Sequence, residues 1–234
     1  MLEVIAPDLY VAAAPFRAFG VDLGARMTVV RLPSGDLWMH SPIRIDDALA
    51  DAVTALGPLR HIVAPSAFHH LFVRGWMDRF PAATLHAPDA LGKKRRDLAI
   101  HRPLAEEPDP AWGGVIATCH IDGAPMADEW VFLHEPTRAL ITTDSLFHFI
   151  ERPDWPRWKR TYLRLTAASG GVRTSRVFRF IVRDRAAFRA SMERVLAWAP
   201  DRLIPAHGEV LPTGAAAAVR EGLGWLLDEA GPRP

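Results

Sequence analysis

Short apolar runs alternate with segments of helical spacing early in this sequence, and this alternation restricts the possible folds more than any other feature. Four consecutive segments are predicted as helix, strand, helix and strand: residues 46–57, 60–65, 67–80 and 83–88. Asp46 or Asp47 can cap the first helix, and Gly57 ends it. Strands that alternate with helices along a chain are typical of an α/β fold.

Further strand-like runs lie on either side of this alternation. The earlier ones are predicted to be antiparallel, with a hairpin turn between the second and third: 9–16, 25–32 and 36–42. After a polar, proline-rich loop at 92–112, three runs are predicted to begin a second sheet: 115–122, 129–136 and 138–144. Residues 151–160 are interpreted as a connector and 177–184 as a strand or the start of a helix. A helix, a strand and a helix follow: 185–199, 201–211 and 215–230.

Composition limits the class of protein and its partners. With 234 residues and no clear internal boundary, we expect a single domain spanning 1–234. The net charge of +1 gives no reason to expect nucleic acid or a membrane as partner. Cys119 is the only cysteine, so a disulfide or a cysteine-rich metal site within one chain is excluded. Without a signal peptide or a long apolar run, we expect a cytoplasmic protein, while a homo-oligomer stays open.

Three loops share one pattern, in which an apolar strand runs directly into side chains that can bind a metal. His69 and His70 follow the strand at 60–65, Asp144 follows another strand, and His207 follows a third. Loops at the carboxyl ends of strands in α/β folds can direct side chains into a common crevice. Imidazole and carboxylate groups together are ligands for zinc, iron or manganese. The pattern therefore predicts a metal site, although it does not select the metal.

The motifs VAPSAFHH, LITTDSLF and LIPAHGEVL, in this order, resemble the metallo-β-lactamase superfamily. The resemblance implies an αββα four-layer sandwich with two mixed β-sheets. It also implies metal ligands at His70, Asp144 and His207, with His69 at the place of the aspartate in the first motif. Adjacent helical residues diverge by about 100°, so one of the two histidines is expected to face the site while the other packs or forms a hydrogen bond. We favour His70 as the ligand.

The resemblance is incomplete at three positions where that superfamily has histidines. Pro65 and Ala67 occupy two of them, and Ala124 or Pro125 the third. One of the two usual metal subsites has thus lost its histidines. We therefore expect one divalent metal ion, zinc in the first place, with iron or manganese as alternatives.

Each candidate has an alternative explanation that involves no metal. His69 and His70 could pair with nearby carbonyl groups, Asp144 could cap a helix formed by SLFHFI, and His207 could close a turn. His40 is a candidate for contact with the ligands or the substrate, and so is His148, placed one helical turn after Asp144. Two further features are ambiguous: KKRR at 93–96 could bind phosphate or form a solvated loop, and Trp155 with Trp158 could form a lid, a dimer contact or a small apolar cluster.

The function expected from these residues is metal-dependent, hydrolase-like chemistry on a small molecule, with Asp144 also orienting a water molecule. One alternative is a protein of the same fold that has lost its metal and binds a ligand or a partner. Another is iron-dependent oxidoreductase chemistry on the same ligands.

Overall fold

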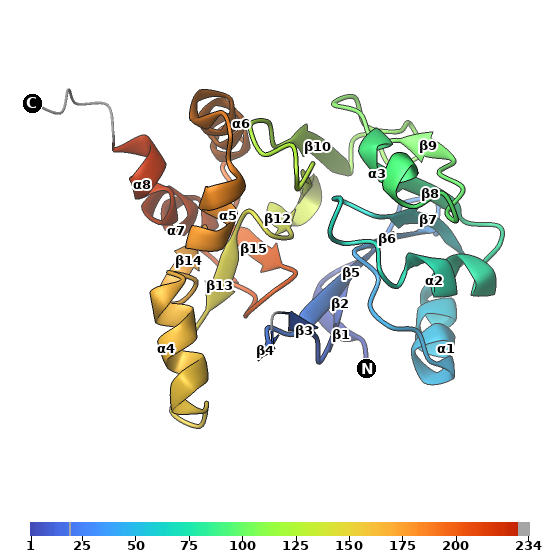
Figure 1. The fold of residues 1–234 in the computed structure, drawn as a ribbon. Coiled ribbons are helices and arrows are strands. Elements are labelled where there is room, and N and C mark those ends of the chain that lie inside the picture. The colour runs from blue at the N-terminus through green and yellow to red at the C-terminus, as the bar shows by residue number, and fades with distance from the viewer. Residues whose placement is uncertain (19, 229–234) are drawn as a thin grey trace, which may run out of the picture. The chain divides into compact units, whose positions relative to one another are not determined.

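The computed structural model describes residues 1–18 and 20–228, and the chain divides into two compact units, Met1–Ile116 and Ala117–Pro234. Each unit contains helices and a β-sheet with both parallel and antiparallel neighbours (Figure 1). The predicted α/β class with two mixed β-sheets is therefore confirmed. That the whole chain forms a single domain stays a prediction.

The first unit is built on a seven-stranded sheet of order β1-β2-β5-β6-β7-β8-β9. Its strands are β1 (Glu3–Ala6), β2 (Leu9–Ala14), β5 (Ala25–Arg31), β6 (Leu37–His40), β7 (Leu59–Val63), β8 (Thr84–Ala87) and β9 (Arg102–Pro103). In this order, neighbouring strands pair antiparallel as far as β6, and β6, β7, β8 and β9 pair in parallel. The predicted hairpin turn joins β5 to β6, and Gly35 adopts a φ of 86° there. A separate small hairpin pairs β3 (Arg17–Ala18) with β4 (Val21–Asp22).

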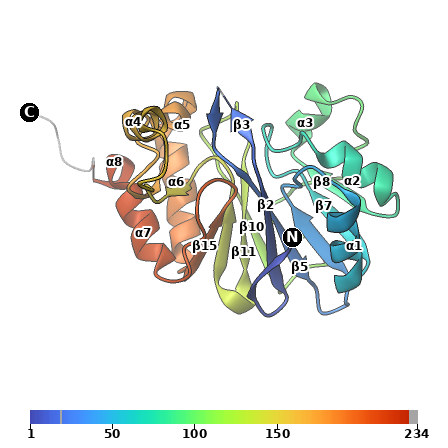
Figure 2. The same cartoon turned by 90° about the horizontal axis from the view of Figure 1, so that it is seen from below.

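Three helices of the first unit lie on one side of this sheet (Figure 2). They are α1 (Asp47–Leu56), α2 (Val73–Arg79) and α3 (Asp89–Lys94). Asp46 caps α1 as predicted, since its Oδ1 accepts a hydrogen bond from the backbone N–H of Leu49 at 2.8 Å. In α2, Trp76 is fully buried and its indole N–H donates to the carbonyl of Ile43 at 2.7 Å. These contacts close an apolar core between the helices and the sheet.

The helix predicted at 67–80 is wrong in its first half. Residues between Ser66 and Val73 form turns, and α2 begins only at Val73. The hydroxyl of Ser66 accepts hydrogen bonds from the backbone N–H groups of Phe68 and His69, at 3.2 and 3.1 Å. Such local bonds compete with helix formation. His69 and His70 therefore lie in a turn beyond the end of β7, ahead of the helix.

The second unit contains a four-stranded sheet of order β10-β11-β12-β15. Its strands are β10 (Ile116–His120), which starts at the last residue of the first unit, β11 (Trp130–His134), β12 (Ala139–Thr142) and β15 (Arg202–Pro205). The short 3₁₀ helix η1 (Glu135–Thr137) joins β11 to its antiparallel neighbour β12, and β12 pairs with β15 in parallel. A second small sheet pairs β13 (Phe147–Phe149) with β14 (Gly171–Arg173).

Over residues 117–228, the second unit also contains the helices α4 (Arg157–Leu165), α5 (Arg176–Ile181), α6 (Arg185–Ala197), α7 (Ala215–Gly222) and α8 (Gly224–Leu227). Helices α5, α6 and α7 lie on one side of the four-stranded sheet (Figure 2). The predicted connector at 151–160 is correct for its first six residues and wrong for its last four, because α4 begins at Arg157. The helix predicted at 215–230 is interrupted at Leu223, and residues 229–230 lie outside the described part. None of the helices in the described ranges has both the length and the apolar character needed to cross a bilayer.

Candidate metal site

Asp144 lies in a tight bend between β12 and β13, and Glu129 holds the residues on either side of it. Glu129 is fully buried and directly precedes β11. Its carboxylate accepts hydrogen bonds from the backbone N–H groups of Thr143 and Ser145, both at 2.8 Å, and from the hydroxyl of Ser145 at 2.9 Å. Hydrogen bonds to a charged acceptor are stronger than neutral ones. The backbone on both sides of Asp144 is thus fixed by one carboxylate.

The ionisation of Glu129 reflects opposing effects. Burial, the largest of them, and the negative charge of Asp144 raise the pKa of Glu129, while the bonds from Thr143 and Ser145 lower it, and together these effects raise the pKa to about 7. Since Glu129 takes part in three hydrogen bonds as acceptor, it holds the bend best in its carboxylate form.

His207 follows β15 and faces Asp144 within the second unit. Its Nε2 lies 3.7 Å from Oδ1 of Asp144, and its side chain is almost fully buried. This separation is too long for a good hydrogen bond. Two ligands that each lie about 2.1 Å from a tetrahedral ion are about 3.4 Å apart, which is close to the observed spacing. The pair therefore fits two ligands of one metal ion better than an ion pair closed on itself.

His148 positions the loop that carries His207. On β13 its backbone carbonyl accepts from the N–H of Glu209 at 2.7 Å, and its ring Nδ1 lies 2.9 Å from the carbonyl of Glu209. Because a carbonyl only accepts, Nδ1 of His148 carries the proton. Gly208, which lies between His207 and Glu209 in the chain, has a φ of 90°. Its backbone packs so closely against β13 that a Cβ on this residue would lie 2.2 Å from the carbonyl oxygen of His148.

The segment SLFHFI forms a bend and strand β13, so two alternatives from the sequence are wrong. Asp144 does not cap a helix there, and His148 is not one helical turn beyond it. His148 was expected near the site, and it acts on the site through the backbone of residues 207–209.

In the first unit, His69 is half-buried and pairs with Ser41. Nδ1 of His69 lies 2.8 Å from the hydroxyl oxygen of Ser41, a residue whose φ of 50° turns the chain after β6. A serine hydroxyl can accept as well as donate. With the proton on Nδ1, the lone pair of His69 is on Nε2, which is the arrangement that metal-binding histidines use.

The neighbouring His70 is arranged differently. Its Nδ1 lies 2.8 Å from Nη1 of Arg95, and a guanidinium group can only donate. The proton of the neutral ring is therefore on Nε2, and neither nitrogen then offers a lone pair to a metal. Burial, and then the charges of Lys94 and Arg95, lower the pKa of His70 to about 4. His70 is suited to donate a hydrogen bond from Nε2.

The basic run at 93–96 supports this turn. Lys94 donates from Nζ to the carbonyl of Ala67 at 2.7 Å, and Arg95 also pairs with Asp97. Two of the four residues of this run, Lys94 and Arg95, therefore have partners within the protein. This is a structural role that differs from both alternatives, phosphate binding and a solvated loop.

His40, on β6, is buried and stacks on Trp38 with ring centroids 5.8 Å apart. Burial, and then the proximity of His69, keep the pKa of His40 well below its usual value, so its ring is neutral.

The positions that the resemblance assigns to missing histidines have no side-chain ligand atom. Pro65, Ala67 and Ala124 are buried, and Pro125, the alternative to Ala124, is exposed. Sequence reasoning missed Glu129, Ser41 and Arg95, which position the candidate ligands. The one available signal was an acidic residue directly before the apolar run WVFL, an unusual place for a charge at the start of a buried strand.

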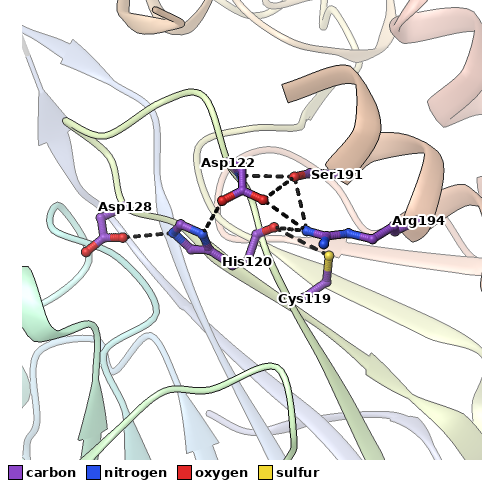
Figure 3. Close-up of polar contacts among 6 residues, drawn as sticks. All are labelled: Cys119, His120, Asp122, Asp128, Ser191 and Arg194. Carbon is purple, nitrogen blue, oxygen red and sulfur yellow. Dashed lines mark hydrogen bonds and ion pairs between the residues drawn. The ribbon is translucent and has the colours of Figure 1, made fainter. Parts of the chain in front are cut away.

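A second polar cluster lies elsewhere in the second unit, around His120 (Figure 3). Its Nδ1 lies 2.9 Å from Asp122 and its Nε2 2.9 Å from Asp128, while Ser191 and Arg194 bind the other oxygen of Asp122. The bond to Asp128 is the main cause that raises the pKa of His120, burial opposes it, and Asp122 adds to it. With both nitrogens donating, this ring is a structural cation and offers no ligand atom.

We expect this cluster to make stability depend on pH. The pKa of His120 is higher in the folded than in the unfolded chain, so its contribution is complete below about pH 6.5 and disappears as the pH rises through the folded-state pKa. Urea unfolding should show that His120→Gln lowers the free energy of unfolding by about 1 kcal/mol at pH 5.5 and by less near pH 9. If the difference in the free energy of unfolding between wild type and His120→Gln stayed constant from about pH 5.5 to about pH 9, it would contradict the assignment of a positive charge to His120.

Comparison with known proteins agrees with the fold. A family model described as a domain of unknown function (DUF4336) matches residues 15–91, about a third of the chain. No curated protein matches the sequence. Solved structures match nearly the whole chain. A metallo-β-lactamase from Pontibacter korlensis is 11% identical, with a TM-score of 0.67 and coverage of 98% of this chain and 99% of that one.

The second is the metallo-β-lactamase FIM-1 from Pseudomonas aeruginosa in its mono-zinc form, 11% identical, with a TM-score of 0.64 and coverage of 98% and 95%. The third is a metal-soaked Flv1 flavodiiron core from Synechocystis, 13% identical, with a TM-score of 0.66 and coverage of 97% of this chain and 60% of that one. The chain therefore has the metallo-β-lactamase fold, as the three motifs predicted.

Proposed function

We propose that this protein is a metal-dependent hydrolase that acts on a small molecule and holds one divalent ion with Asp144, His207 and His69. The observation that carries the proposal is the 3.7 Å spacing of Asp144 and His207, each on a loop fixed by its own buried partner. His69 joins them in the proposal because it stands at a ligand position of the first motif, and because a proton on Nδ1, toward Ser41, would put its lone pair on Nε2.

The donor set supports zinc. Two imidazoles and a carboxylate are a common zinc ligand set, and with three protein ligands one position stays open for chemistry. One solved protein of this fold is described in a mono-zinc form, so a single ion is compatible with this architecture. Three positions have no histidine, namely Pro65, Ala67 and either Ala124 or Pro125, and this favours one ion over two.

The chemistry follows from the roles of the residues. A bound divalent ion supplies Lewis acidity and lowers the pKa of water, which allows hydrolysis without a covalent enzyme intermediate. Asp144 has a second carboxylate oxygen that can orient the attacking water. His70, with its proton held on Nε2 by Arg95, can donate to an oxygen of the substrate in place of binding the ion. Burial keeps His207 and its surroundings poor in water, which strengthens such interactions.

Metal content tests the proposal. Elemental mass spectrometry on untagged protein should find about one zinc ion per chain, as expected for a mononuclear site. We expect His69→Ala, Asp144→Asn and His207→Ala each to lose that metal. His70→Ala should keep most of it, and His101→Asn, which changes an exposed histidine of the first unit, should keep all of it.

Different outcomes identify the alternatives. Loss of metal in His70→Ala but not in His69→Ala would restore the ligand choice expected from the sequence. Iron in place of zinc would favour oxidoreductase chemistry. Wild-type protein that takes up neither zinc, iron nor manganese would contradict the proposal and favour a binding protein of this fold. The small-molecule substrate and the cytoplasmic location stay predictions.

A further inference from the structure

Positive charge is concentrated in one segment of the second unit. Residues 157–183 contain eight basic residues and no acidic one: Arg157, Lys159, Arg160, Arg164, Arg173, Arg176, Arg179 and Arg183. The rest of the chain has 20 basic and 27 acidic residues, so the net charge of +1 combines +8 in this segment with −7 elsewhere. The overall balance therefore hides a strongly cationic region.

Five of these cations have no carboxylate partner within the described ranges. Arg160 and Arg164 both pair with Glu151, and Arg173 pairs with Glu221. The other five make no such pair: Arg157, Lys159, Arg176, Arg179 and Arg183. Some of them stack on aromatic rings, as Lys159 does on Trp155 with its Nζ 4.5 Å from the ring centroid.

Large apolar side chains lie exposed among these cations. On α4, Trp158 and Leu165 are seven residues apart and so share one face, and they are 55% and 67% exposed. On α5, Val177 and Phe180 share a face and are 50% and 77% exposed. The two helices are joined at their ends, because Arg176 donates from its backbone N–H to Thr166 and from its side chain to Leu165. We call these four apolar residues, together with the five cations that have no carboxylate partner in the described ranges, the α4–α5 surface.

We propose that the α4–α5 surface binds the surface of an anionic lipid bilayer. Basic amphipathic helices with exposed Trp, Phe and Leu bind at such interfaces, where the apolar tips enter the headgroup region and the cations meet anionic lipids. A second copy of the chain would bring like charges together. Nucleic acid would use the cations and the aromatic rings but gain little from Leu165 and Val177. This proposal replaces the expectation, drawn from net charge, that no membrane is involved.

Co-sedimentation of the full chain with vesicles tests the proposal. We expect binding to vesicles of equal parts phosphatidylcholine and phosphatidylglycerol, weaker binding at about 1 M NaCl, and none to phosphatidylcholine alone. Phe180→Ser should weaken partition roughly tenfold through lost apolar contact. Arg157→Glu should weaken it by at least about fivefold through lost charge. The matched controls Val4→Ser and Arg31→Glu change an exposed apolar and an exposed basic residue of the first unit and should bind like wild type.

Circular dichroism of each variant should match wild type, since all four positions are exposed. Three results would overturn the proposal. The first is failure of wild-type protein to sediment with anionic vesicles. The second is that Phe180→Ser binds the vesicles as well as wild type, which would mean that charge alone attracts the protein to the lipid and that no apolar side chain enters it. The third is preferential capture of a single-stranded oligonucleotide in competition with the vesicles. Metal content is measured separately, so failure here leaves the proposed function untouched.

Discussion

Replacing Glu129 by alanine is expected to lower the free energy of unfolding by about 4 kcal/mol, because it leaves three buried hydrogen-bond donors without their acceptor. The backbone N–H groups of Thr143 and Ser145 cannot reach another partner without opening the bend that carries Asp144. Glu129→Gln keeps the volume but sets an amide NH₂ against these donors, and about half of that loss is expected. Urea unfolding followed by far-UV circular dichroism measures both.

The same variants connect stability to the proposed metal site. If Asp144 is a ligand, freeing its backbone should weaken metal affinity by about 10- to 100-fold, as for other residues that orient ligands. Competition with a chelator measures this in Glu129→Gln, which retains the fold. Glu193→Ala, which removes a carboxylate exposed on α6 and paired with Arg189, is the control and should change stability by about 0.5 kcal/mol or less. A Glu129→Ala protein as stable as wild type would show that the hydrogen bonds from Thr143 and Ser145 to Glu129 do not stabilise the bend.

Gly208→Ala is expected to cost about 3 kcal/mol or more, and Gly170→Ala only about 1 kcal/mol. The two glycines have nearly the same φ, 90° and 88°, so both are in the positive-φ range where an alanine is strained. They differ in their surroundings, because a Cβ on Gly208 would lie 2.2 Å from the carbonyl of His148, whereas nothing lies within 4 Å of one on Gly170. We therefore expect the close approach to account for most of the difference between the two variants.

Thermal and urea unfolding of both variants provide the measurement, with metal content beside it. In Gly208→Ala, we expect the bonds between β13 and residues 207–209 to open and His207 to leave Asp144, so metal should be lost as well. Equal losses of stability in the two variants would show that the packing of this loop is not what fixes His207.

Elements with a strong local signal were predictable from the sequence. Helix α1 combines apolar residues at helical spacing with Asp46 as cap and a glycine as end, and the structure agrees at both ends. Helix α4 was missed because the two prolines and two tryptophans at 153–158 are typical of a loop. Pro156 directly precedes the first turn of α4, and a proline at that place does not disrupt the helix. The start of α2 was misplaced because Ser66 caps a turn there and not the helix.

The candidate site was partly predictable for the same reason. Asp144 and His207 follow apolar strands directly, and that local pattern was enough to single them out. Glu129 and Arg95 act on residues 14–16 and 25 positions away, and no motif links such pairs in a single sequence. The choice between His69 and His70 depends on which neighbour is an obligatory donor, and only the folded structure provides that information.

The two loops of the candidate site differ in how far along the chain their supports lie. Glu129 grips the Asp144 bend from 14 to 16 residues away, so this contact can form as soon as the β11–β12 hairpin closes. His148 supports the His207 loop from 61 residues before its partner Glu209, across a segment that includes α4, α5 and α6. Closing a longer loop costs more chain entropy and comes later in folding. During synthesis of the chain, the carboxylate of Asp144 would thus be in place well before the imidazole of His207, which faces it.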